Sequence, residues 1–161
     1  LGEIREELVE AGYMKPHPKE RLRRKKKQRL EKPRPLSFKA SSGNTILVGL
    51  NNRQNDYLTF KMAGGRDIWL HAQGLPGSHV IIKSAAGAAA ESDLEEAALL
   101  AAHYSRGREL PAVAVDYTEV RHLRRAPGGK PGFVLYNRYQ TITVNPRDEK
   151  LKQLLQQHIP E

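Results

Sequence analysis

One segment of this chain is set apart from the rest by its charge. Residues 15–34 contain eleven Lys or Arg and only two Glu, so they carry a net charge of +9, while everything outside them holds sixteen residues of each sign. Three prolines, Pro16, Pro18 and Pro33, interrupt the same stretch, and Pro35 follows it directly. Such a segment has too little apolar surface to join a core. We therefore expect a basic linker or arm at residues 14–35, a folded domain at residues 36–161, and no net basic character in that domain.

The basic segment indicates an anionic partner, because clustered cations attract phosphate-rich surfaces. RNA, DNA and an acidic membrane surface all fit this chemistry. The arm residues that we expect to contact phosphate are Arg23, Arg24, Lys25, Lys26 and Lys27. Contacts of this kind do not depend on base sequence and weaken as salt rises. The alternative is that the segment is only a solvated tether or a short exposed helix.

Several classes of protein are excluded, and no enzyme is predicted. The chain has no cysteine, so disulfides, cysteine-based zinc sites and cysteine nucleophiles are ruled out. It contains no run of 18 apolar residues, so no segment is expected to span a membrane. Of the possible anionic partners we expect a nucleic acid and no membrane. Gly128-Gly129-Lys130 is not a phosphate-binding P-loop, because the upstream glycine spacing and the following Ser or Thr are missing. We expect no catalytic residue, no metal ion and no cofactor.

The hydrophobic pattern predicts short strands and a few helices. Short or alternating apolar runs bounded by Gly, Pro, Asn and Ser favour strands, and apolar residues three or four apart favour helices. We expect strands near residue 38 and at 45–49, 67–72, 79–83, 113–115, 118–123, 133–136 and 141–144, and helices at 1–12, 55–62, 92–104 and 148–158. Ser92 and Glu95 form a predicted capping box. The fold class is α+β, with a mostly antiparallel sheet and a few packed helices.

The segment Asp67-Ile68-Trp69-Leu70-His71 carries the most informative polar pattern. In a strand, Asp67, Trp69 and His71 point to one face, about 6.6 Å apart from one to the next. An anion, a large aromatic ring and an imidazole in one row form a recognition face on which a base can stack. The alternative is a core Trp flanked by a satisfied Asp–His pair, and for Trp69 alone this alternative is favoured, because Trp is highly buried on average.

A second motif, Pro76-Gly77-Ser78-His79, follows closely. Its backbone N–H groups and the Ser78 hydroxyl suit a phosphate, but a plain tight turn is the more common use of such residues. The later loop at residues 126–132 is rich in Pro and Gly and carries Lys130, which makes it a plausible basic contact.

These segments resemble the NFACT-R domain. The matching blocks are VGLNNRQNDYLT (48–59), DIWLH (67–71), PGSHV (76–80), EAA (96–98), AAHYS (101–105), VDYT (115–118) and KPG (130–132). They follow the family's order from about residue 36 to residue 144. One departure is Leu50, where bacterial members often have a basic residue. NFACT-R is the C-terminal domain of the bacterial RqcH family, formerly called fibronectin-binding proteins.

The resemblance implies a function in ribosome-associated quality control. The implied role is RNA binding that supports C-terminal alanine tailing of stalled nascent chains in the cytoplasm. The implied partners are tRNA, in particular alanyl-tRNA, the large ribosomal subunit, and the N-terminal NFACT domain of the same parent chain. The family's coiled coil precedes this domain, so residues 1–13 would be the end of a coiled-coil helix.

We rank the expected RNA-binding residues of the folded part accordingly. The recognition face is Asp67, Trp69, His71 and His79, with Ser78 beside it; Asn51, Asn52 and Arg53 come next, and Lys130 follows. A different class of function remains open. The chain would then be a protein-interaction module, either an adhesin-like domain that binds fibronectin or a docking domain for its own chain.

Overall fold

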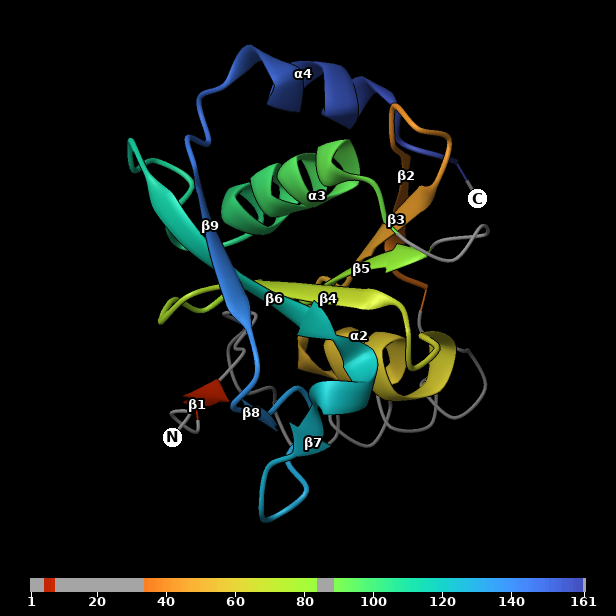
Figure 1. Cartoon of the computed structure of the whole chain (residues 1–161), viewed down its shortest axis with the longest axis vertical. Helices are drawn as coiled ribbons and strands as arrows, with labels where there is room; N and C mark the ends of the chain where they lie inside the picture. Colours follow the sequence, from red (N-terminus) through yellow and green to blue (C-terminus); the bar gives the residue numbers. More distant parts are fainter. Residues whose placement is uncertain (1–4, 8–33, 84–88, 161) are drawn as a thin grey trace, which may run out of the picture.

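The structure is a computed structural model that describes residues 5–7, 34–83 and 89–160 (Figure 1). Its main element is a six-stranded sheet in the order β2-β3-β5-β4-β6-β9, in which every neighbouring pair is antiparallel. The strands are β2 (Leu36–Lys39), β3 (Thr45–Val48), β4 (Ile68–Ala72), β5 (Val80–Lys83), β6 (Val113–Glu119) and β9 (Gln140–Val144). The predicted α+β class with a mostly antiparallel sheet is confirmed.

Helices and a second, small sheet cover the two faces of this sheet (Figure 1). On one face lie α3 (Glu91–His103) and, outside it, α4 (Glu149–Gln156). On the other face lie α2 (Asn52–Tyr57) with its π-helical continuation η1 (Leu58–Met62), the short 3₁₀ helix η2 (Val120–His122), and a sheet of β1 (Arg5–Glu7), β8 (Val134–Tyr136) and β7 (Arg124–Arg125). We call these the α3 side and the α2 side.

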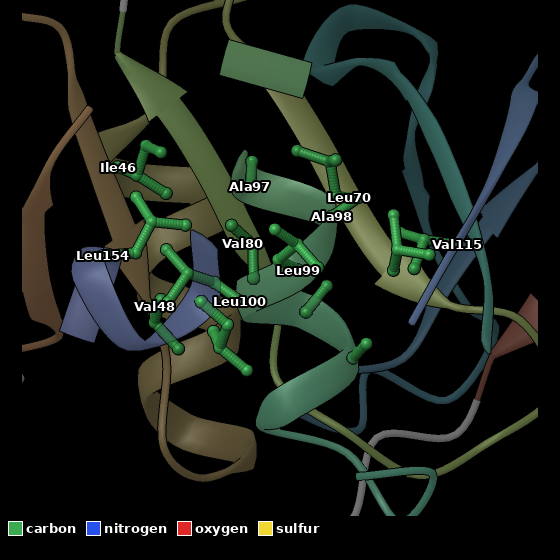
Figure 2. Packing of buried hydrophobic residues seen from close by; sticks show 14 of the residues in the cluster. Ile46, Val48, Leu70, Val80, Ala97, Ala98, Leu99, Leu100, Val115 and Leu154 are labelled. Atoms are coloured by element: carbon green, nitrogen blue, oxygen red, sulfur yellow. The ribbon is translucent and has the colours of Figure 1, made fainter. Parts of the chain in front are cut away.

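The core on the α3 side is built from an alanine-rich helix. Residues 97 to 102 of α3 read Ala-Ala-Leu-Leu-Ala-Ala, and all six are buried. Small side chains let the helix axis approach the sheet closely, and Leu99 and Leu100 fill the remaining space between the strands and α4. Figure 2 shows these side chains beside Val48, Leu70 and Val80 of three neighbouring strands.

The central strands are buried on both faces because their odd and even residues meet different clusters. In β4, Leu70 and Ala72 pack on the α3 side, whereas Trp69 belongs to the cluster on the α2 side. In β5, Val80 and Ile82 pack on the α3 side and Ile81 packs opposite Trp69. The predicted alternation of Asp67, Trp69 and His71 against Ile68 and Leu70 is therefore correct. The expectation that their face is solvent-exposed is wrong.

Two helices begin earlier than the sequence predicts, because other residues cap them. The helix expected at 55–62 starts at Asn52, where Asn51 Oδ1 accepts a hydrogen bond from the Gln54 N–H at 2.8 Å. The helix α3 starts at Glu91, and the capping contact comes from the Asp93 carboxylate, which accepts from the Ala90 N–H at 3.0 Å. Ser92 therefore lies inside α3 and is not its cap.

One strand prediction and one helix prediction also need correction. The segments expected at 113–115 and 118–123 form one strand, β6, followed by η2. The residues Arg5–Glu7 form β1, paired with β8, where a helix was expected over residues 1–12. The rest of that range and the arm up to residue 33, with Arg23, Arg24, Lys25, Lys26 and Lys27, lie outside the described residues, so the coiled-coil end and the linker remain predictions.

Candidate nucleic-acid interface

The charged side chains divide unevenly between the two sides of the six-stranded sheet. Acidic residues gather on the α3 side, in α3, in α4 and just before it: Glu91, Asp93, Glu95, Glu96, Asp148 and Glu149. Exposed cations gather on the α2 side, in α2, η1, η2, β7 and the loop at 126–132: Arg53, Lys61, Arg121, Arg124, Arg125 and Lys130. We call this second group the basic face.

The acids near the basic face are neutralised by ion pairs. Asp56 pairs with Arg125 at 2.5 Å, Asp67 pairs with Lys83 at 2.7 Å, and Glu119 pairs with Arg121. The face therefore presents a surplus of positive charge to solvent. Exposed cations without carboxylate partners keep their full attraction for phosphate.

The folded part is itself basic, contrary to the expectation that only residues 15–34 carry the charge. Residues 35–160 contain fifteen Lys or Arg and eleven Asp or Glu, a net charge of +4. The apparent balance arose because Glu3, Glu6, Glu7 and Glu10 precede the arm and Glu161 ends the chain. The folded part can therefore attract an anion without the arm.

Tertiary contacts bring together two segments that the sequence analysis treated separately. Gly132 adopts φ +83°, a left-handed conformation that favours glycine, and a Cβ at this position would lie 3.2 Å from the carbonyl oxygen of Asn52. The Gly132 N–H also donates to Asp56 Oδ1 at 3.4 Å. The loop at 126–132 therefore packs against the start of α2. The predicted residues Asn51, Asn52 and Arg53 thus share one region of the surface with the loop that carries Lys130.

The cations of the basic face differ in the contacts that they make. Arg125 is held in place, because it pairs with Asp56 and its guanidinium carbon lies 4.3 Å from the centre of the Phe60 ring. The Lys130 Nζ lies 5.6 Å from the centre of the Phe133 ring. Within the described residues, Arg53, Arg124 and Lys130, like Lys61, form no ion pair, so they are available to an anionic ligand. Sequence reasoning did not single out Arg124, whose only signal is its place beside the Pro-Gly loop.

The predicted recognition residues Trp69, His71 and His79 lie together, but in the interior. Each has no exposed surface. The Trp69 ring stacks on His71 with centroids 5.8 Å apart, and it meets the His79 and Tyr136 rings edge-on at 5.3 and 5.0 Å. This is the core alternative for Trp69, although its Nε1 has no hydrogen-bond partner among the described residues. None of the three rings is available for base stacking in this conformation.

The two buried imidazoles are neutral at physiological pH. Burial lowers the pKa of His71 to about 4, and the nearby backbone of Gly77 and the Asp116 carboxylate only partly oppose this effect. Burial, together with the neighbouring His71, lowers the pKa of His79 well below its usual value. A neutral imidazole is able to accept as well as donate a hydrogen bond, and His79 Nδ1 lies 2.7 Å from Thr59 Oγ1. His71 and His79 therefore connect β4 and β5 to η1, and their role is structural.

Asp67 and Ser78 also have structural contacts. The Asp67 carboxylate accepts from the Gly64 N–H at 2.8 Å and from Lys83 Nζ at 2.7 Å, which fixes the turn before β4. Ser78 is buried, and its N–H donates to the Tyr104 carbonyl at 2.9 Å. Both residues are therefore held by contacts within the fold.

No alternative chemistry is evident in the part of the chain that the structure describes. It contains no group of three or more His, Asp or Glu placed to hold a metal ion. None of its helices is long and apolar enough to cross a bilayer.

Known proteins similar to this chain share both its sequence and its fold. The chain is 45% identical over 146 residues to the Rqc2 homolog RqcH of Bacillus subtilis (strain 168), which is 91% of this chain and 25% of that protein. It is 43% identical over 155 residues to the Rqc2 homolog RqcH of Streptococcus suis (strain 05ZYH33), which is 96% of this chain and 27% of that protein. The chain thus spans about a quarter of the length of these relatives.

A solved structure confirms the likeness in three dimensions. The C-terminal part of the fibronectin/fibrinogen-binding protein from Streptococcus suis superposes with a TM-score of 0.71 at 42% sequence identity, covering 77% of this chain and 50% of the other. The family described as the NFACT protein RNA binding domain matches residues 34–136. These residues include β2 to β8 of the fold, with the basic face and the buried Trp–His cluster. The chain therefore belongs to the family of NFACT protein RNA-binding domains.

Proposed function

We propose that this domain binds RNA through its basic face, with Arg53, Arg124 and Lys130 contacting the phosphate backbone. The observation that carries the proposal is the separation of charge across the sheet. Among the described residues, Arg53, Arg124 and Lys130 lie on the α2 side without an ion-pair partner, and the acidic residues of α3 and α4 lie on the other side. On the α3 side Glu95 pairs with Lys150 and Glu149 pairs with Lys152, so that side has no comparable surplus of positive charge. The arrangement therefore orients an RNA molecule toward the basic face.

Trp69, His71 and His79, which were predicted as recognition residues, form a rigid scaffold behind the basic face. Asn55, between Arg53 and Asp56 in α2, is buried, and its Oδ1 accepts from the His79 N–H at 3.0 Å. Thr59, in the adjoining η1, contacts the His79 ring. The Trp69–His71–His79 cluster therefore positions α2, and with it Arg53, without touching RNA. Phosphate contacts set affinity and orientation rather than base sequence.

For the RNA itself, we propose tRNA and large-subunit ribosomal RNA. The support is that the relatives are Rqc2 homologs named RqcH and that the matched family is an RNA-binding domain. In this proposal the domain acts in ribosome-associated quality control and supports alanine tailing with alanyl-tRNA, beside the N-terminal NFACT domain of its parent chain. The arm residues Arg23 to Lys27 add salt-sensitive affinity, and the domain performs no catalytic step.

The test is a titration of labelled tRNA by fluorescence anisotropy over a salt series. The full chain is compared with a triple variant of the basic face, Arg53→Gln, Arg124→Gln and Lys130→Gln. A matched triple variant, Lys39→Gln, Arg147→Gln and Lys152→Gln, removes exposed cations away from that face. A third variant replaces Arg23 to Lys27 by Gln.

We expect the basic-face variant to lose affinity and salt dependence together. Each phosphate contact contributes about 0.9 to the log–log salt slope on duplex RNA and about 0.7 on single strands. Loss of three contacts therefore flattens the slope by about 2 to 3. The proposal is refuted if the matched control lowers affinity as much as the basic-face variant, or if only the arm variant loses binding.

The relative titled as a fibronectin/fibrinogen-binding protein supports a second candidate, a protein-interaction module. A fibronectin interface of this kind would rest on apolar contacts, which salt does not weaken. Saturable fibronectin binding that persists at high salt, with no binding of tRNA, would establish this function. If moderate salt abolishes fibronectin binding, the contact is electrostatic, and the protein-interaction module is not supported.

A further inference from the structure

A cleft with a volume of about 260 Å³ contains none of the three cations to which the proposed function assigns phosphate contacts. Its walls are the residue Leu50 after β3, the turn Pro76–Ser78, and the segment from His103 to Arg108 at the end of α3. The volume is slightly below the range of pockets that enclose a whole small ligand, about 300–1,000 Å³. The cleft therefore suits one ring system or one side chain of a larger molecule.

Backbone contacts make the walls of the cleft rigid. The Ser78 N–H donates to the Tyr104 carbonyl at 2.9 Å, and the Arg106 N–H donates to the Pro76 carbonyl at 3.0 Å. A Cβ on Gly77 would lie 2.8 Å from the Cβ of Ser105, so only glycine permits this approach of the two segments. The site is thus preformed, which lowers the entropic cost of binding.

The cleft combines apolar surface with positive charge. Leu50 is 42% exposed, and Tyr104 is half-buried with its ring against His103 at a centroid distance of 4.8 Å. Arg106 and Arg108 are exposed and form no ion pair with any described residue. The Arg108 guanidinium lies 3.2 Å from His103 Nε2, which orients it at the rim of the cleft. No Asp or Glu lines the cleft.

We propose that this cleft receives one unpaired nucleotide of a bound RNA, with the base against Leu50 and Tyr104 and the adjoining phosphates on Arg106 and Arg108. This inference rests on the proposed function, since it takes RNA as the ligand. Unpaired bases are recognised by aromatic and arginine surfaces, with the backbone held by cations. A base in a duplex is stacked between its neighbours and does not enter such a cleft.

The cleft and the basic face both include residues of α2. Asn55 lines the cleft, and Arg53 lies two residues earlier, on the basic face. In this proposal, an RNA strand on the basic face has the cleft within reach at α2. Leu50 suits the wall of the cleft, because an apolar side chain packs against the face of a base. A basic residue at this position would contact a phosphate instead.

The test compares a single-stranded RNA containing one 2-aminopurine with a blunt RNA duplex of the same length, both bound to the full chain. The variants are the double substitution Arg106→Gln and Arg108→Gln, and the single substitution Leu50→Ala. The matched control is the double substitution Arg147→Gln and Lys152→Gln. Circular dichroism and thermal unfolding confirm that each variant is folded; Leu50 is partly exposed, so Leu50→Ala is expected to fold.

We expect the double arginine variant to bind the single strand about 10-fold more weakly, with a salt slope smaller by about 1.4, while its duplex affinity changes by less than about twofold. Leu50→Ala is expected to reduce the change in 2-aminopurine fluorescence that accompanies binding to the wild-type chain. Equal loss on both RNAs, or a loss no larger than in the matched control, overturns the inference and leaves the proposed function intact. If the wild-type chain binds neither RNA, the proposed function fails as well. Retained RNA binding with loss of binding to a peptide bearing a free C-terminal carboxylate would assign the cleft to a peptide instead.

Discussion

The buried histidines predict a stability that falls as the solution becomes acidic. Burial lowers the pKa of His71 from 6.5 to about 4 in the folded state. Between these values the unfolded chain binds a proton at this position and the folded chain does not. The free energy of unfolding therefore rises with pH in this window and is lost as pH falls through it. His79 and the partly buried His103 have pKa values shifted in the same direction.

The size of the effect follows from the shift at His71. At about pH 5, the unfolded state holds nearly one proton on this imidazole and the folded state about a tenth of one. The free energy of unfolding at about pH 5 is then lower by about 2 kcal/mol than at about pH 8, from this residue alone. His71 is fully buried, so solvent screening does not reduce the figure.

The assay is urea unfolding at about pH 5 and about pH 8, followed by far-ultraviolet circular dichroism. His71→Gln is expected to reduce the difference in unfolding free energy between the two pH values by about 2 kcal/mol. His122→Gln, which removes a histidine from η2 and keeps His71, is expected to leave the difference as in the wild type. A His71→Gln protein with the wild-type pH dependence would show that His71 is not a buried neutral imidazole.

Three further predictions concern stability. Trp69→Ala removes the largest side chain of the core on the α2 side and is expected to cost about 3–5 kcal/mol in urea unfolding; a cost below about 1 kcal/mol would contradict its burial. Gly77→Ala forces the turn away from Ser105 and is expected to cost about 1–3 kcal/mol, measured by thermal unfolding; an unchanged melting temperature would argue against the close approach. Asp93→Asn weakens an acceptor of hydrogen bonds from Ser42 at 2.5 Å, Asn44 at 2.8 Å and Ala90 at 3.0 Å, so urea unfolding should show a loss of about 1.5–3 kcal/mol, whereas a neutral result would mean that water replaces the carboxylate.

Most of the fold could be predicted from the sequence, because its strands are short apolar runs bounded by turn residues. Periodicity placed Trp69 and His71 on one face and Leu70 on the other. Periodicity does not say what covers a face. The face of Trp69 is buried by Leu58, Leu123 and Val134, which come from segments distant in sequence, so its environment is a property of the tertiary structure alone.

The candidate site was predicted less completely for a related reason. Arg53 and Lys130 were expected as contacts, but their neighbourhood depends on Gly132 packing against Asn52, which links positions about eighty residues apart. The cleft was missed altogether, since Leu50, the turn Pro76–Ser78 and the residues after α3 are brought together only by the tertiary structure. The net charge of the residues outside 15–34 is zero, which also concealed the basic face. Acidic residues near the two ends of the chain offset the positive charge of the folded part in that sum.

The last residues of the domain determine how it responds to a pulling force. The Ile159 N–H donates to the Ser37 carbonyl at 2.7 Å, and the Lys39 N–H donates to the Gln157 carbonyl at 3.0 Å, so the tail runs antiparallel along the outer edge of β2. Ile159 therefore lies opposite the start of β2, where the chain enters the domain. A load applied between residues 35 and 160 pulls at one end of this antiparallel pair. It therefore breaks the hydrogen bonds one after another and does not shear them all at once. The tail should peel at low force while the sheet behind it remains folded.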